Sequence, residues 1–208
     1  MKEPVLSTIA TLQDISDITA LTNGWIYRDT ERWDELRELF HADGIIEIGW
    51  FKGLFSEFIK ASIRMQEIAV IQSKHVMASP IVEINGDRAV AETSAVLVGV
   101  NNHLKLGFTG HTRFFDLIER RSGVWRISKR NCIYDMCFFS FPAEPIAIDQ
   151  SKLARYPWEY APLAYVIEAS GHEVATTHPT RGSQAEAKLR QAGANWLNGC
   201  LPVQEITD

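Results

Sequence analysis

The first third of the chain repeats its apolar residues with the period of a helix. Apolar side chains recur at steps of three or four over residues 10–27, and the same spacing predicts helices at 31–40 and 54–68. Between the last two, HADG (41–44) should end a helix at its glycine, and IIEIGW (45–50) predicts a strand that a turn at FKG follows.

The period changes from 3.6 to 2 from His75 onward, as expected for strands with one buried face. NGD (85–87) and RSG (121–123) predict hairpin turns between the strands. The strand candidates span residues 74–84, 88–100, 104–120 and 124–139. Helices followed by a run of antiparallel strands predict an α+β fold, with the helices packed on one face of the sheet.

The residues after the last strand differ in character from the rest. FPAEPIAIDQ (141–150) carries two prolines and predicts a linker, and an amphipathic helix is expected at 185–199. The tail is aromatic and apolar enough to dock, so we expect it to cover the mouth of a pocket or to cross onto a neighbouring subunit. We therefore divide the chain into a catalytic domain (1–140) and a C-terminal extension (141–208).

Composition narrows the possible partners and the compartment. The chain has 208 residues, 46% hydrophobic, with a net charge of −5, and no basic run that would favour nucleic acid. No apolar stretch reaches the roughly 20 residues that a membrane helix needs, and the N-terminal sequence lacks the apolar segment of a signal peptide. Cys132, Cys137 and Cys200 form no CxxC pair, which favours reduced thiols in the cytoplasm.

The sequence also lacks the usual signatures of bound metals and nucleotide cofactors. The six histidines form no HxH or HxxxH spacing, and no glycine-rich phosphate loop is present. We therefore expect a protein that works without a cofactor or metal on a small-molecule substrate.

Three segments carry a resemblance to a known family: YRDTERWDELRELFHADG (27–44), SKHVM (73–77) and GHTRFFDLIERRSGVWRISKRN (110–131). Over about residues 8–140, the chain resembles the SnoaL-like branch of the nuclear transport factor 2 (NTF2)-like superfamily, which includes scytalone dehydratase and hexachlorocyclohexane dehydrochlorinase. The resemblance implies a cone-shaped, cystatin-like fold, in which helices and a strongly curved antiparallel sheet enclose a pocket. It also implies cofactor-independent lyase chemistry and favours a homotrimer.

The resemblance assigns catalytic roles to four residues. Asp29, four residues before Trp33, lies where these lyases keep an aspartate, and His75 lies where they keep the histidine paired with it. His111 matches a second histidine of scytalone dehydratase, and Arg130 matches an arginine of the dehydrochlorinase. A histidine has an ordinary pKa of about 6.5, which suits His75 to act as a general base that a carboxylate orients. Arg130 and His111 would then assist departure of the leaving group.

Several of these residues also have a plainer explanation. Asp29 could only cap the helix that follows it, and His75 could be a core histidine with no role in chemistry. Arg130 could be a solvated strand residue that pairs with Glu119 or Asp116 across a hairpin.

The stretch SKRNCIYDMCFF places a cation, a thiol and a phenol at alternate positions. Ser128, Arg130, Cys132 and Tyr134 should therefore share one face of a strand. A buried polar face without partners is costly, so we expect these residues to line a pocket opposite the aspartate–histidine pair. Cys132 itself is expected to be a small apolar filler rather than a nucleophile.

Aromatic residues near these positions are the expected contacts of an aromatic or polycyclic substrate. The predicted substrate-binding residues are Trp25, Tyr27, Trp50, Cys132 and Tyr134. Three positions depart from scytalone dehydratase: Arg28 replaces a tyrosine, Trp50 lies near the place of its second catalytic tyrosine, and Cys132 replaces an asparagine. These departures leave the substrate open.

Three functions remain at this point. The first is a lyase that eliminates water, halide or formaldehyde from an aromatic compound. The second is an isomerase or polyketide cyclase of the ketosteroid-isomerase type, and the third is a non-catalytic binding or assembly subunit. A hydrogen-bonded Asp29–His75 pair that faces a cavity would count against the third.

Overall fold

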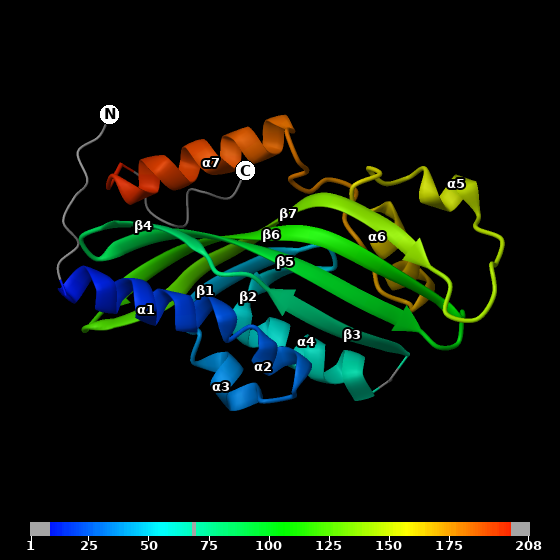
Figure 1. The fold of residues 1–208 in the computed structure, drawn as a ribbon, viewed down its shortest axis with the longest axis horizontal. Helices are drawn as coiled ribbons and strands as arrows, with labels where there is room; N and C mark the ends of the chain where they lie inside the picture. Colours follow the sequence, from blue (N-terminus) through cyan, green and yellow to red (C-terminus); the bar gives the residue numbers. More distant parts are fainter. Residues whose placement is uncertain (1–8, 68–69, 201–208) are drawn as a thin grey trace.

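The computed structural model describes residues 9–67 and 70–200, which form helices on both sides of one curved sheet (Figure 1). The helices are α1 (Ile9–Asn23), α2 (Ile26–Asp29), α3 (Trp33–Arg37), α4 (Phe55–Glu67), α5 (Gln150–Leu153), α6 (Ala161–Ala169) and α7 (Gln184–Leu197). The strands are β1 (Phe40–Ile48), β2 (Phe51–Leu54), β3 (Ile71–Met77), β4 (Ile81–Asn85), β5 (Arg88–Asn101), β6 (Leu106–Arg121) and β7 (Val124–Ser140). The predicted α+β class is confirmed.

The sheet has the strand order β2-β1-β7-β6-β5-β3, and β4 pairs with the first half of β5. Strands β5 to β7 form its centre and are 14, 16 and 17 residues long. Gly86 and Gly123 adopt φ values of 61° and 80° in the two predicted hairpin turns, a conformation that glycine adopts without steric cost. The predicted antiparallel sheet is confirmed, and among the pairs of named strands only β1–β7 is parallel.

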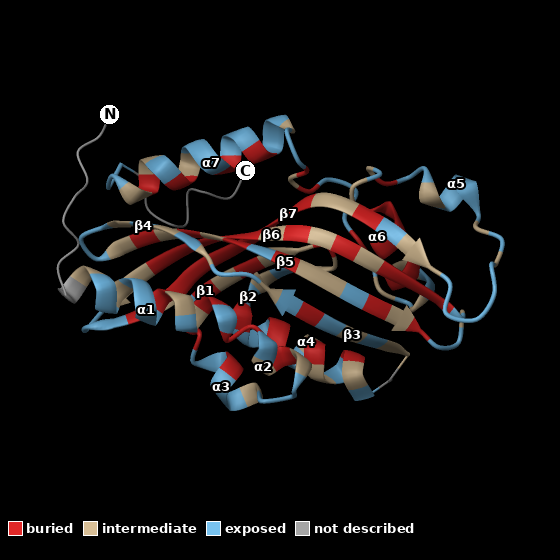
Figure 2. Ribbon diagram, in the orientation of Figure 1, coloured by how far each residue is buried: buried red, intermediate tan, exposed pale blue. Residues whose placement is uncertain are grey.

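Each face of the sheet carries its own apolar cluster. Helices α1 to α4 lie on one side of the sheet, which we call the inner face, and α7 lies on the other, the outer face (Figure 1). The central strands are buried over most of their length because both faces are covered there (Figure 2). On the outer face, α7 approaches closely: a Cβ on Gly193 would lie 2.6 Å from the Phe115 ring.

Several predicted elements differ at their ends for identifiable reasons. The predicted helix 10–27 breaks at Gly24, where a Cβ would lie 2.6 Å from Leu39 Cδ2. The predicted helix 31–40 ends at Arg37, because Phe40 pairs with Ile127 of β7 and begins β1. HADG therefore lies within an irregular part of β1.

Two further corrections concern where the predicted strands begin and where they are interrupted. FKG (51–53) belongs to β2, because the turn that joins β1 to β2 lies at residues 49–50. The predicted strand 74–84 is two strands, interrupted at residues 78–80, and both halves pair with β5.

The described part of the C-terminal extension packs on its own chain. Residues 141–149 are irregular, as the two prolines predict, and α6 then packs against β6 and β7. The chain continues alongside β7, where Tyr134 N donates to Pro179 O at 2.9 Å and Arg181 N donates to Tyr134 O at 2.9 Å. The boundary near residue 140 and the crossing onto a neighbouring subunit stay predictions. None of the described helices combines the length and apolar character needed to cross a bilayer.

Candidate active site

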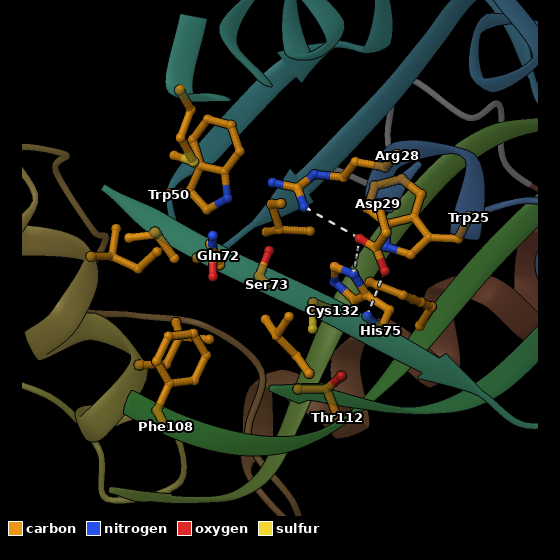
Figure 3. A pocket seen from close by; sticks show the side chains of 18 of the residues that line it. Trp25, Arg28, Asp29, Trp50, Gln72, Ser73, His75, Phe108, Thr112 and Cys132 are labelled. Carbon is orange, nitrogen blue, oxygen red and sulfur yellow. Dashed lines mark hydrogen bonds and ion pairs between the residues drawn. The ribbon is translucent and has the colours of Figure 1, made fainter. Parts of the chain in front are cut away.

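A cavity of about 320 Å³ lies between the inner face of the sheet and helices α2, α4 and α6. Its volume is in the range of small-molecule binding sites. Figure 3 shows Trp50 and Phe108 on one side of it and Trp25, Asp29 and His75 on the other. Most of the lining is apolar, with side chains from every surrounding element, including Trp25, Trp50, Met65, Leu97, Phe108 and Ile167.

Asp29 and His75 form a doubly hydrogen-bonded pair in this cavity. His75 Nδ1 lies 2.8 Å from Asp29 Oδ1, and the backbone N–H of His75 donates to Asp29 Oδ2 at 2.5 Å. The Asp29 side chain is 5% exposed and the His75 side chain is 7% exposed. Because a carboxylate only accepts, Nδ1 carries the proton and Nε2 keeps its lone pair. The pair therefore holds a histidine ready to accept a proton at Nε2.

The chain reverses sharply just after Asp29 and fixes the position of this carboxylate. Asp29 is the last residue of α2, and Glu31 follows with φ at 58°, a conformation that is uncommon outside glycine. Arg32 N closes the turn by donating to Tyr27 O at 2.8 Å. The next helix has no side-chain cap, and both Asp29 oxygens are bound to His75. The alternative that Asp29 only caps a helix is therefore wrong.

The electrostatics of the pair keep His75 neutral. Burial lowers the pKa of His75, and the hydrogen bond and charge of Asp29 only partly offset it. Burial acts to raise the pKa of Asp29, but the hydrogen bonds and charge of His75 outweigh it, and that pKa is lowered. At neutral pH the pair is thus an ionised carboxylate and an uncharged imidazole, which is the state that a general base requires.

Cys132 and Tyr134 of β7 also line the cavity. The Tyr134 hydroxyl accepts a hydrogen bond of 2.8 Å from Gly49 N and interacts with Cys132. Burial raises the pKa of Cys132 to about 12, so this cysteine stays a thiol, as its predicted role as a small filler requires. Thr112 of β6 also contacts Cys132 and lines the cavity.

Arg28 is a lining residue that sequence reasoning did not single out as functional. It precedes Asp29 in α2, and its guanidinium points into the cavity (Figure 3). Nη1 lies 3.7 Å from Asp29 Oδ1. The signal in the sequence was the replacement of a family tyrosine by arginine at this position. Within residues 9–67 and 70–200, no group of three or more histidine, cysteine, aspartate or glutamate side chains could hold a metal ion.

A family model described as a SnoaL-like domain matches residues 10–131. The chain belongs to the SnoaL-like domain family. This SnoaL-like protein is 27% identical over 197 residues to pea pathogenicity protein 2 of Fusarium vanettenii, with 86% of this chain and 83% of that protein covered.

Two solved structures share the fold of this SnoaL-like protein. One is a protein assigned as a scytalone dehydratase from Novosphingobium aromaticivorans, with a TM-score of 0.53, 14% identity, and coverage of 66% of this chain and 93% of the other. The other is the hexachlorocyclohexane dehydrochlorinase LinA-type3 from Novosphingobium barchaimii, with a TM-score of 0.51, 17% identity, and coverage of 66% and 96%. The predicted superfamily and its curved-sheet fold are confirmed.

The SnoaL-like cavity does not include all of the predicted site residues. Trp25, Asp29, Trp50, His75, Cys132 and Tyr134 line it. Tyr27 does not: it stacks with Arg32, whose Cζ lies 4.3 Å from the ring centre. The predicted placement of Tyr27 in the pocket is therefore wrong.

Arg130 lies in the core of the SnoaL-like domain rather than on the cavity wall. Its Nε and Nη2 donate to the two carboxylate oxygens of Asp116, each at 2.7 Å, and both side chains are fully buried. Its Cζ lies 4.4 Å from the Phe114 ring centre and 4.8 Å from that of Trp25. The predicted position of Arg130 beside the substrate is wrong. Ser128, from the same strand face, donates to Glu119 Oε2 at 2.8 Å.

His111 also lies outside the cavity, on the outer face of the sheet. Phe108, Thr112 and Phe114 of β6 line the cavity, and strand alternation turns His111 to the opposite side. A register shift between β6 and β7 falls between His111 and Thr112. Thr112, the next residue of β6, lines the cavity where His111 was expected.

Proposed function

We propose that this SnoaL-like protein is a cofactor-independent lyase that eliminates a small group from an aromatic or polycyclic molecule. The observation that carries the proposal is the neutral imidazole of His75, oriented by Asp29 and open to a largely apolar cavity. The pair carries a desolvation cost, and its position on the wall of a cavity favours a role in chemistry over a purely structural one.

His75 Nε2 removes a proton from the substrate carbon. The Asp29 carboxylate then stabilises the imidazolium, since it already accepts the Nδ1 proton. A positioned base of this type contributes roughly 10²–10⁴-fold in rate. The largely apolar lining of the cavity strengthens charge interactions inside it.

Tyr134 and Thr112 assist departure of the leaving group, the role that was predicted for Arg130 and His111. Tyr134 oxygen accepts from Gly49 N, which leaves the phenol proton for Cys132 or for a departing oxygen or halide. The Thr112 hydroxyl is the second donor on this wall. The names of two structural neighbours, a dehydratase and a dehydrochlorinase, denote eliminations and support the same class of reaction here.

The proposal is tested by incubating the purified protein, without added cofactor, with aromatic and hydroaromatic alcohols and halides in D₂O. Proton NMR separates loss of a group from exchange of a substrate proton for deuterium. We expect elimination, and we expect His75→Asn to abolish it while leaving the melting temperature near that of the wild type. Exchange without loss of a group would replace the lyase by an isomerase, and His75→Asn activity within tenfold of wild type would remove His75 as the base.

Assembly into a homo-oligomer is a separate part of the proposal. The resemblance favours a trimer, and sedimentation of the purified chain measures its mass directly. A monomer at micromolar concentration would contradict it without affecting the chemistry, because the cavity is lined by one chain.

A further inference from the structure

Arg28 is a buried cation whose hydrogen-bonding capacity the protein leaves largely unused. The residue is 8% exposed and lies at the wall of the cavity (Figure 3). A guanidinium offers five N–H donors. Burial lowers the pKa of Arg28 from its ordinary value of 12.5, and the charge of Asp29 only partly offsets this effect. Groups of this kind are normally paired when they are buried.

No other described residue accepts a hydrogen bond from the Arg28 side chain. The 3.7 Å between Nη1 and Asp29 Oδ1 is too long for a hydrogen bond, and both Asp29 oxygens already accept from His75. Arg28 Nε is fully buried without a partner. The Phe58 ring centre lies 6.0 Å from Cζ, at the outer limit of a cation–π contact.

Other arginines of the same chain show how this protein satisfies a guanidinium that it uses for structure. Arg130 donates two hydrogen bonds to Asp116 at 2.7 Å, although its Nη1 also lacks a partner, and Arg113 contacts three carboxylates within 3 Å. Arg28 has the same chemistry, but its free donors face a cavity large enough for a ligand. Asp29 is near enough to form an ion pair with Arg28, but the hydrogen-bond acceptor that these donors lack is expected to come from that ligand.

We propose that Arg28 binds an anionic oxygen group of the substrate, so that the substrate is a mainly apolar carboxylic acid. The planar carboxylate matches the two parallel N–H donors of a guanidinium and forms the strongest class of hydrogen bond. The apolar lining accommodates the remainder of the molecule. This inference rests on the proposed lyase function, since it identifies the substrate class of the same site.

The position of Arg28 also explains how such a substrate would be oriented. Asp29 Oδ1 lies 2.8 Å from His75 Nδ1 and 3.7 Å from Arg28 Nη1. The imidazole and the guanidinium therefore lie beside the same carboxylate oxygen. A substrate whose acid group is held by Arg28 presents its nearby carbon atoms to His75. Arg28 thus acts as an anchor that selects acids and fixes the atom to be deprotonated.

The test is direct binding of inert ligands, measured by calorimetry at pH 7.5. 2-Naphthoate carries the carboxylate, 2-naphthamide is its neutral counterpart, and 2-naphthol tests a phenolic oxygen as the alternative source of the anion. We expect the wild type to bind naphthoate at least tenfold more tightly than naphthamide or naphthol. Arg28→Gln should abolish that preference, and Arg28→Lys should keep part of it.

Two further variants make the result specific. Arg37→Gln removes an exposed arginine outside the cavity and should leave the preference unchanged. His75→Asn should lose turnover yet keep the preference, which separates failure of the anchor from failure of the lyase. Equal affinity for naphthoate and naphthamide would overturn the proposal, as would a preference that survives Arg28→Gln. Failure to bind either naphthoate or the smaller acid benzoate would also overturn it. Tighter binding of naphthol than of naphthoate would reassign the anion to a phenolate.

Discussion

Two arginine sites on opposite sides of the sheet differ in how far the protein satisfies their hydrogen-bond donors. On the outer face, Arg113 is bound by Asp135, Glu92 and Glu186, and Arg190 of α7 joins the same network. On the inner side, Arg130 of β7 is likewise paired with Asp116, whereas the Arg28 guanidinium, which α2 contributes to the cavity wall, makes no hydrogen bond to any described residue. A network in which each charge is satisfied stabilises the fold. A charge left open toward a cavity instead marks the place where a ligand completes the structure.

The largest expected effect is a difference in the free energy of unfolding between matched substitutions of Arg130 and Arg28. Arg130→Gln should destabilise the fold by about 3–5 kcal/mol, because it leaves the buried Asp116 without its partner. Arg28→Gln should change the free energy of unfolding by less than about 1 kcal/mol, since it breaks no hydrogen bond between described residues. Urea unfolding of both variants measures the contrast. Equal losses would show that Arg28 is also a structural residue.

The second prediction concerns the carboxylate that orients His75. Asp29→Asn should lower kcat/KM by about 10–100-fold, because asparagine cannot stabilise the imidazolium as a carboxylate does. The melting temperature should change little, and Asp34→Asn, on the exposed face of α3, is the matched control. A large fall in melting temperature with unchanged kcat/KM would return Asp29 to a structural role.

A smaller effect is expected from Glu186, which holds α7 on the outer face. Arg113 and Arg190 outweigh the effect of burial and lower the pKa of Glu186 to about 2. Glu186→Gln should therefore cost about 1–2 kcal/mol at pH 7. The wild-type advantage is complete above the ordinary value of about 4.5 and is lost as the pH falls toward 2.

Urea unfolding at pH 7 and pH 3, with activity measured beside it, tests this outer-face network. Activity should be unaffected, because Glu186 does not line the cavity. A loss of turnover at unchanged stability would contradict the separation of the two faces.

The smallest effect is the pH dependence of His75 above its ordinary pKa. Because burial lowers the pKa of His75, kcat/KM should vary less than about twofold between pH 6.5 and 8. The same shift gives the sign for stability: below about 6.5 the unfolded chain takes up a proton first, so the contribution is full above this pH and declines below it. A kcat/KM that rises steeply between pH 6.5 and 8 would show a charged resting histidine.

The sequence predicted the long strands well because their signals are local. Period-two alternation and the glycines of the two hairpin turns suffice to place β5, β6 and β7. The end of α3 could not be placed in this way. Phe40 leaves the helical pattern because a distant strand, through Ile127, pairs with it. Tertiary pairing of this kind overrides local periodicity.

The candidate site shows the same limit at single residues. Asp29 and His75 were identified from a resemblance, and the structure brings them together. His111 was misplaced because strand alternation in β6 turns Phe108, Thr112 and Phe114 toward the cavity, so an error of one residue moves the predicted side chain to the other face. Arg130 was misplaced because its partner, Asp116, lies on the neighbouring strand, and only the packing shows that the pair is dry.

The central claim is that His75 rests as a neutral imidazole with its proton on Nδ1 and its lone pair on Nε2. Proton–nitrogen correlation NMR of the ¹⁵N-labelled protein reports this tautomer without any substrate, and His75→Asn assigns the signal. At pH 7 the account predicts a protonated Nδ1 and an unprotonated Nε2, with the pattern weakened or reversed in Asp29→Asn. A doubly protonated ring, or a proton on Nε2 in the wild type, would contradict it.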